Sequence, residues 1–143
     1  MVVLRPATLA DEAMLRAWRN DPDTCAASIT SETVNAADHH EWFAAALASP
    51  RRWLFIAEDD GVAVGTGRID KLVLDHLCTL SVTVAPAHRG RRFAEQIIEA
   101  LVDRAHDLGF ETCLASVKGG NTPSMHAFMR TGFHANGIVT FIR

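Results

Sequence analysis

A strand, a basic loop and a long helix follow one another in the middle of the chain, and this order constrains the fold more than any other feature. The apolar stretch Leu77–Val84 has the length and residue types of a strand and ends just before Pro86. Over residues 91–108, apolar side chains recur at helical spacing, and Gly109 ends the pattern. Because Thr112–Val117 is predicted to be the next strand, the three segments form a strand–helix–strand unit with parallel strands.

The flanking segments add antiparallel strands and further helices. Two apolar runs, Trp53–Ala57 and Val62–Gly65, surround an Asp-Gly pair, which predicts a tight hairpin because glycine accepts a positive φ. Further strands are predicted at Val2–Leu4 and Ile138–Ile142, further helices over residues 8–20, 35–49 and 121–132, and a loop over Asp23–Val34. This order predicts a single α/β domain over residues 1–143, with a mixed sheet and helices on both faces.

Composition and charge argue against several classes of partner. The net charge is -3 and no block of lysine or arginine is present, so nucleic-acid binding is not expected. No apolar run approaches the roughly 20 residues of a membrane helix, and acidic residues come early in the N-terminal segment, which predicts a cytoplasmic protein without a signal peptide. Cys25, Cys78 and Cys113 lack any ligand spacing, which predicts buried, reduced thiols and no metal site.

The loop between the central strand and its helix has the features of a phosphate-binding site. Where a helix begins, the first backbone N–H groups have no partner within the helix and the positive end of the helix dipole points outward, so a pyrophosphate satisfies both. Gly90 allows close approach of the backbone, while Arg89, Arg91 and Arg92 add positive charge. The alternative is a solvated basic turn that only caps the helix.

Two motifs resemble the GNAT superfamily of acyl-CoA-dependent N-acyltransferases. The loop is similar to the family pattern (Gln/Arg)-x-x-Gly-x-(Gly/Ala), with Arg89 first, Ala94 last and Arg92 at the place of the middle glycine. The stretch Asn121–Phe133 is similar to the family helix Asn-x-x-Ser-x-x-Leu-Tyr-x-Lys-x-Gly-Phe. The resemblance covers the whole chain and implies a GNAT-like fold, with a mixed sheet of six to seven strands flanked by about four helices.

The resemblance also implies acetyl-CoA as the cofactor. Its pantetheine arm is expected between the strand Leu80–Val84 and the strand Thr112–Val117, with the N–H near Val84 polarising the thioester carbonyl. The residues expected to bind the cofactor lie in that strand, in the loop and in the second motif. They are Val82, Thr83, Val84, Arg89, Gly90, Arg91, Arg92, Phe93, Ala94, Asn121, Ser124, Phe128 and Arg130.

The acid and base of the reaction are the parts of the site that the sequence defines least. The family usually places a tyrosine, as general acid, where this chain has Phe128, and the chain contains no tyrosine. The thiolate therefore leaves unprotonated or meets water, or Ser124 or His126 supplies the proton. His76, at the start of the central strand and next to Asp75, is the candidate base because histidine titrates near neutral pH. The alternative for His76 is a loop residue without a function.

The N-terminal helices are expected to shape the site of the amine. By resemblance to two GNAT branches, one that acetylates nucleotide-linked amino sugars and one that acetylates ribosomal-protein N-termini, the expected acceptor-binding residues are Trp18, Arg19, Asn20, His39 and Trp42. Indole and imidazole rings can stack on a sugar or a base, and Arg19 can pair with a phosphate. Trp18 and Trp42 can equally be core residues that hold two helices to the sheet.

The leading hypothesis is an N-acetyltransferase that acts on a primary amine of a small molecule, with an amino sugar or a nucleotide-linked amino sugar as the favoured acceptor. The alternatives are an N-terminal acetyltransferase of proteins and a silent acyl-CoA-binding domain. Because few residues follow Phe133, the tail is expected to form one last strand, and the exposed sheet edge then favours a homodimer.

Overall fold

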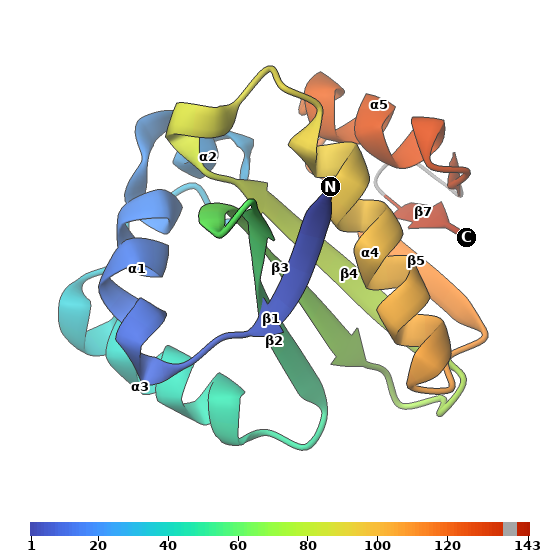
Figure 1. Ribbon diagram of the computed structural model, residues 1–143, viewed down its shortest axis with the longest axis horizontal. Coiled ribbons are helices and arrows are strands. Elements are labelled where there is room, and N and C mark those ends of the chain that lie inside the picture. The colour runs from blue at the N-terminus through green and yellow to red at the C-terminus, as the bar shows by residue number, and fades with distance from the viewer. Residues whose placement is uncertain (136–139) are drawn as a thin grey trace.

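A computed structural model describes the chain except for residues 136–139. In this part of the chain seven strands form one sheet in the order β1-β2-β3-β4-β5-β7-β6 (Figure 1). The strands are β1 (Val2–Pro6), β2 (Arg52–Asp59), β3 (Val62–Lys71), β4 (Leu77–Val84), β5 (Thr112–Ser116), β6 (His134–Ala135) and β7 (Thr140–Ile142). Strands β4 and β5 are parallel and the other neighbours are antiparallel, so the predicted mixed α/β sheet is confirmed.

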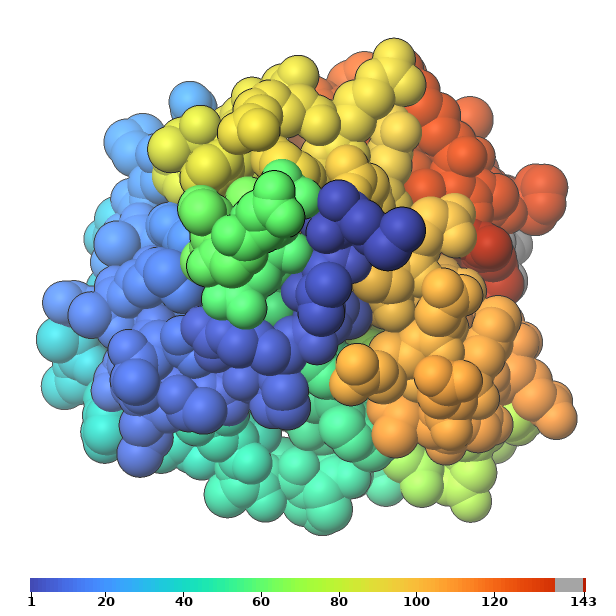
Figure 2. All heavy atoms as spheres, viewed as in Figure 1, coloured from blue at the N-terminus to red at the C-terminus, as the bar shows by residue number. Residues whose placement is uncertain are grey.

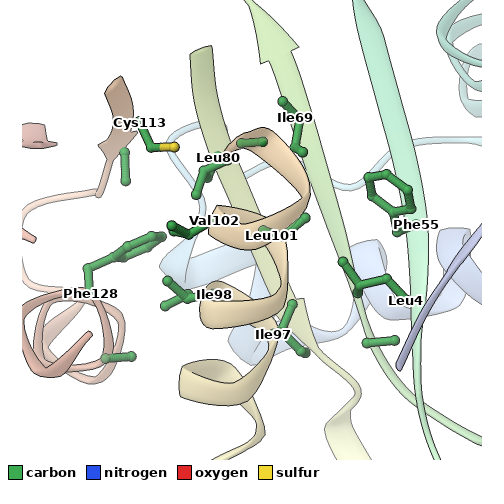
Figure 3. Close-up of a cluster of buried hydrophobic side chains, with 14 of the residues drawn as sticks. Leu4, Phe55, Ile69, Leu80, Ile97, Ile98, Leu101, Val102, Cys113 and Phe128 are labelled. Carbon is green, nitrogen blue, oxygen red and sulfur yellow. The ribbon is translucent and has the colours of Figure 1, made fainter. Parts of the chain in front are cut away.

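Helices cover both faces of the sheet. They are α1 (Glu12–Asn20), α2 (Pro22–Ala27), α3 (Ala36–Ala48), α4 (Phe93–Asp107) and α5 (Thr122–Arg130), with the short 3-10 turns η1 (Leu9–Asp11) and η2 (Pro86–His88). Side chains of a strand point alternately to the two faces. In β2, Leu54 and Ile56 therefore pack with α1 and α3, whereas Phe55 and Ala57 pack in the cluster under α4 (Figures 1 and 3).

The interface between α4 and β3 depends on two glycines. A Cβ atom at Gly65 would lie 2.6 Å from the carbonyl oxygen of Thr83 and 2.8 Å from Cδ1 of Ile97. At Gly67 it would lie 2.8 Å from a methyl group of Leu101. Helix α4 therefore lies directly on the backbone of β3, and its first turn is held beside the end of β4.

The prediction of a loop over Asp23–Val34 is wrong at its beginning, where α2 forms. Asp21 ends α1, and together with Pro22 it also starts the next helix. The Asp21 carboxylate accepts a hydrogen bond from the Thr24 N–H at 3.1 Å, and Pro22 occupies the first helical turn. Proline is favoured there because that N–H has no helical partner.

The C-terminal tail contributes two strands to the sheet where the sequence predicted one. In the predicted strand Ile138–Ile142, residues 140–142 form β7, and residues 138 and 139 lie outside the described residues. Strand β6, which was not predicted, pairs antiparallel with β7 and forms this edge of the sheet. Within the described residues, no helix is long and apolar enough to cross a membrane.

All three cysteines are free and buried, as the sequence predicts. Cys78 and Cys113 are partners in the parallel register of β4 and β5, and their Sγ atoms lie 3.7 Å apart. They belong to the cluster of buried side chains that α4 covers, part of which Figure 3 shows. Both thiols therefore fill the core where β4 and β5 are paired.

The start of the first helical segment is held by a partly buried ion pair. Thr8 and Asp11 have the spacing of a capping box, and the Thr8 N–H donates to the Asp11 carboxylate at 2.8 Å. The Arg5 guanidinium donates two further hydrogen bonds to that carboxylate, at 2.9 and 2.8 Å. Arg5 therefore holds the pKa of Asp11 below its usual value.

Replacing this carboxylate is expected to give a pH-dependent loss of stability. Because the pKa of Asp11 is lower in the folded state, the ion pair stabilises the fold above the unfolded pKa of about 3.9 and is lost as pH falls through the folded pKa. We expect Asp11→Asn to lower the free energy of unfolding by about 1 to 2 kcal/mol near neutral pH, since Arg5 is partly in water. The difference should shrink in acid, as measured by urea unfolding.

The control for this experiment is Asp103→Asn, which changes an exposed carboxylate on α4 that has no ion pair among the described residues. Its effect on stability should be small at every pH. A loss in Asp11→Asn that stays constant down to strong acid would contradict the ion-pair explanation.

Candidate active site

Strands β4 and β5 are paired only at their beginnings. Leu77–Thr79 pair with Thr112–Leu114, and the rest of β4 continues along β3 without a partner strand on its β5 side. The backbone N–H and C=O groups on that side are free of strand pairing and can bind the amide groups of an extended ligand arm. This opening contains the expected residues Val82, Thr83 and Val84.

The loop after β4 places backbone N–H groups at the start of α4. Gly90 has a φ of +76°, and the helix begins at Phe93, after Arg92 in the left-handed region with a φ of +61°. Arg92 stands at the middle glycine of the family pattern, so its conformation is the one that a glycine would favour. An arginine at this glycine position keeps the backbone turn, and the left-handed conformation costs roughly 1 kcal/mol of strain. The first N–H groups of α4 therefore remain suited to a pyrophosphate.

Comparing glycine and alanine at position 92 tests this strain. Both Arg92→Gly and Arg92→Ala remove the guanidinium and its 4.0 Å contact with Glu95, but only alanine keeps a Cβ atom in the left-handed region. We expect the glycine variant to be more stable by about 0.5 to 1 kcal/mol in urea unfolding, although glycine is otherwise the less favourable residue. An alanine variant that is equally or more stable would contradict a left-handed residue 92.

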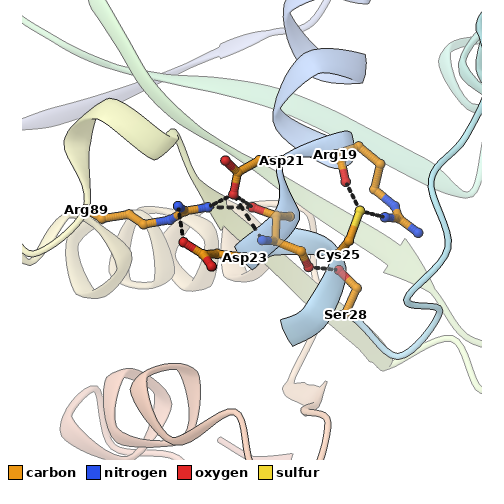
Figure 4. A network of polar contacts seen from close by, with 7 residues as sticks. Arg19, Asp21, Asp23, Cys25, Ser28 and Arg89 are labelled. Carbon is orange, nitrogen blue, oxygen red and sulfur yellow. Dashed lines mark hydrogen bonds and ion pairs between the residues drawn. The ribbon is translucent and has the colours of Figure 1, made fainter.

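Arg89 connects the loop to α2 instead of pointing to open solvent. Its guanidinium lies 2.5 Å from the Asp21 carboxylate and 2.7 Å from the Thr24 hydroxyl, and 3.4 Å from the Asp23 carboxylate (Figure 4). The hydrogen bond from Arg89 lowers the pKa of Asp21. The Asp21 and Asp23 carboxylates therefore balance the positive charge of Arg89, which the sequence predicts to face the phosphate. The contact of Arg89 with the cofactor stays a prediction.

The other end of α2 is bound to the loop between β5 and α5. The Lys118 ammonium donates to the Ala26 carbonyl at 2.9 Å, and the Asn121 amide donates to the Ala27 carbonyl at 3.3 Å. Asn121 also caps α5 by accepting from the Ser124 N–H. Helix α2 thus connects the loops that follow β4 and β5, the two strands that separate.

The remaining residues of the two motifs surround the start of α4. Arg91 lies over the Phe93 ring at 4.9 Å, and Arg130 of α5 pairs with Glu95 at 3.1 Å. Phe128 is buried, and its ring meets the Phe133 ring edge to face at 5.0 Å. Ser124 is half-buried and His126 is exposed, both on α5. The start of α4 therefore has several arginines around it, while the family's tyrosine position is part of the core.

The structure does not bring His76 to this opening. His76 is exposed in the loop before β4, whereas the opening lies toward Val84 at the other end of that strand. A strand of this length separates the two residues by about 25 Å at ~3.3 Å per residue. Proton transfer at the Val84 end is therefore out of reach of His76, and its placement agrees with the alternative of a loop histidine.

A cavity of about 590 Å³ lies on the face of the sheet that α1 and α3 cover, and we call it the acceptor cavity because the sequence predicts that the amine binds to residues of its wall. Its walls come from α1, α3 and the segment after α2, and its floor comes from β3 and β4. The wall residues that the sequence predicted are Trp18, Arg19, His39 and Trp42; the polar floor residues are Thr66, Arg68, Ser81 and Thr83. Asn20, the fifth predicted residue, instead binds both backbone groups of Val34, at 2.7 and 2.8 Å.

His39 is a buried histidine in the wall of the acceptor cavity. It is only 5% exposed, and its ring lies against those of Trp42 and Phe43, with centroids 6.0 and 5.8 Å away. Burial lowers the pKa of His39, and its Nδ1 atom has no hydrogen-bond partner among the described residues. Burial therefore favours the uncharged form of the ring.

The floor of the acceptor cavity, including Arg68, was not predicted from the sequence. Thr66 pairs with Thr83, and Arg68 pairs with Ser81, in the register of β3 and β4. These polar residues occur at every second position, the period of side chains that share one face of a strand. The alternation could be recognised in the sequence, but it does not show that the polar side chains of the two strands form one surface. That follows only from the pairing of β3 with β4.

The known proteins that resemble this chain in sequence or in fold include several acetyltransferases. The family model of the acetyltransferase (GNAT) domain matches residues 2–134. A relative, the L-methionine sulfoximine/L-methionine sulfone acetyltransferase of Pseudomonas paraeruginosa, is 27% identical over 94% of this chain and 81% of its own length. The aminoglycoside acetyltransferase AAC(6')-Ib in complex with coenzyme A and kanamycin superposes with a TM-score of 0.88 at 18% identity, covering 100% of this chain and 94% of its own.

A spermidine N-acetyltransferase from Vibrio cholerae, solved with CoA and spermine, has a TM-score of 0.81 at 17% identity and covers 99% of this chain and 91% of its own. With the family model over nearly the whole chain, the protein belongs to the acetyltransferase (GNAT) family. It is an acetyl-CoA-dependent N-acetyltransferase, and the resemblance found in its sequence is confirmed.

Proposed function

We propose that the protein transfers the acetyl group of acetyl-CoA to a primary amine of a small molecule bound in the acceptor cavity. The position of β4 carries this proposal. One edge of β4 faces the opening toward β5, and its side chains Ser81 and Thr83 line the cavity. A cofactor along the open edge and an amine in the cavity therefore meet at one strand. The sequence resemblance favours an amino sugar as this amine, while the charged residues that line the cavity favour an amine that also carries a carboxylate.

Each part of the site has a role in the proposed reaction. The N–H groups at the start of α4 hold the pyrophosphate, and Arg91, Arg92 and Arg130 lie close enough to add positive charge. Acetyl-CoA supplies an activated thioester, whose carbonyl accepts a hydrogen bond from the backbone near Val84. The amine nitrogen forms the new C–N bond and the C–S bond breaks. The amine nitrogen loses one proton to water, and, because Phe128 cannot donate a proton, the thiolate accepts one from water.

Two measurements test the proposal in sequence. Calorimetry should show saturable binding of acetyl-CoA and of CoA, and the absence of both would end the proposal. Thiol release should then follow with at least one amine from a panel of glucosamine, spermidine, L-methionine sulfone and a peptide with a free N-terminus. Turnover of the peptide alone would favour the N-terminal acetyltransferase, and binding without any turnover would favour a silent acyl-CoA-binding domain.

The assembly and location of the protein stay predictions. We propose that one domain carries both binding sites, because the sheet is continuous through the cofactor opening and the cavity floor. A homodimer through the sheet edge and a cytoplasmic location follow from the sequence alone. Sedimentation of the purified protein tests whether it is a homodimer.

A further inference from the structure

We propose that the acceptor is an α-amino acid and that Arg68 binds its carboxylate. This inference rests on the proposed function, because it concerns the molecule that the acceptor cavity holds. It distinguishes the amines named for the related proteins, since aminoglycosides and spermidine carry several positive charges, whereas methionine derivatives carry one amine and one carboxylate.

The Arg68 side chain is held in place on the cavity floor. Its Nε atom donates to the Asp70 carboxylate at 2.7 Å, and its guanidinium lies over the Trp42 ring, 5.6 Å from the centroid. Its Nη2 atom is 3.4 Å from the Ser81 hydroxyl, and the side chain is 31% exposed. The Nε atom is thus occupied, while the side chain as a whole lines the acceptor cavity. A fixed, planar guanidinium of this kind suits two parallel hydrogen bonds to a carboxylate.

Asp70 does not cancel the positive charge at Arg68. The Nε atom of Arg52 lies 3.5 Å from the other oxygen of the same carboxylate, so the two arginines and one aspartate carry a net charge of +1. Of the other charged residues in the cavity lining, Arg19 donates to the Thr30 carbonyl and Glu32 is exposed. A cavity with this balance favours an anion and opposes a polycation.

The position of Arg68 fits an amine and a carboxylate on the same carbon. Arg68 is opposite Ser81, and Thr83 follows two residues further along β4, toward the opening where the thioester is expected. Two residues of a strand span about 7 Å, which is within reach of an arginine side chain plus the short N–Cα–C unit of an amino acid. The rest of the 590 Å³ cavity is left for the amino-acid side chain.

The test compares two substrates and two variants. The substrates are L-methionine sulfone and the same amine without its carboxylate, 3-(methylsulfonyl)propylamine. We expect Arg68→Gln to lower kcat/KM for L-methionine sulfone by about 30-fold or more and to change it less than about 3-fold for the decarboxylated amine. The matched control is Arg51→Gln, which removes an exposed guanidinium that donates to the Leu72 carbonyl and lies outside the acceptor cavity, and it should leave both substrates nearly unchanged.

Equal losses on both substrates would overturn the inference, because they would indicate a structural role for Arg68. A wild-type preference for spermidine or glucosamine over L-methionine sulfone would overturn it as well. If the wild type binds CoA but acetylates no amine, the proposed function fails separately. Calorimetry of L-methionine sulfone with CoA-saturated protein then decides the inference alone, since heat must appear for the wild type and for Arg51→Gln and be lost in Arg68→Gln.

Discussion

An aspartate in place of Ala94 is expected to weaken CoA binding by about 100-fold or more while leaving the fold intact. Ala94 is half-buried in the first turn of α4, beside the N–H groups that face the expected pyrophosphate. A carboxylate there repels the phosphates. It also interacts favourably with the positive end of the helix dipole, so the helix itself is not weakened. The protein should therefore lose affinity without losing stability.

Ala94→Asn is the matched control, because asparagine has nearly the same shape as aspartate and no charge. Both variants change the packing of residue 94 against the core cluster in the same way, so only the charge differs between them. Affinity for CoA is measured by calorimetry, and the free energy of unfolding by urea titration. The two variants should be similar in stability and differ in affinity. Equal affinities for CoA would show that the pyrophosphate does not lie at the start of α4.

Alanine in place of Gly65 is expected to lower the free energy of unfolding by about 2 to 3 kcal/mol. The added Cβ atom would be 2.6 Å from the Thr83 carbonyl oxygen, which is backbone and cannot turn away. Relief requires that β3 and β4 shift apart or that Ile97 and α4 move outward. Either movement also disturbs the opening beside β4, so CoA affinity should fall together with stability.

Gly119→Ala is the control for this substitution. No atom lies within 4 Å of a Cβ at Gly119, and the residue lies in the loop before α5. Its stability should change by less than about 1 kcal/mol, since alanine only reduces the freedom of the unfolded chain there. If Gly65→Ala were as stable as Gly119→Ala, the close packing of α4 on β3 would be disproved.

The elements predicted best are those with strong local signals. The strand Leu77–Val84 matches β4 at both ends, and Asn35 caps α3 through its side chain, 2.8 Å from the Asp38 N–H. Helix α2 was missed because its signal at Asp21 and Pro22 is also the signal that ends a helix. Capping residues mark a boundary, and only the following residues show on which side of it the helix lies.

The site was predictable where one motif contains the whole binding surface. The loop from Gly90 to Ala94 is such a case for its geometry, since it leads into the start of α4 as expected, and its binding of phosphate stays a prediction. Arg68 and His76 show why the rest was not. Arg68 joins the acceptor cavity only through the pairing of β3 with β4, and His76 is distant only because β4 runs away from it. Both facts are properties of the assembled sheet.

Helix α2 couples the two halves of the site. Arg89 holds its first turn, Lys118 and Asn121 hold its last, and the segment that follows it, from Ser28 to Val34, lines the acceptor cavity. If Arg89 contacts the cofactor as the sequence predicts, the phosphate competes with the Asp21 and Asp23 carboxylates for its guanidinium. Any movement of α2 on cofactor binding therefore reshapes the wall around the amine. If cofactor binding changes the affinity for the amine in this way, binding of the amine changes the affinity for the cofactor by the same factor.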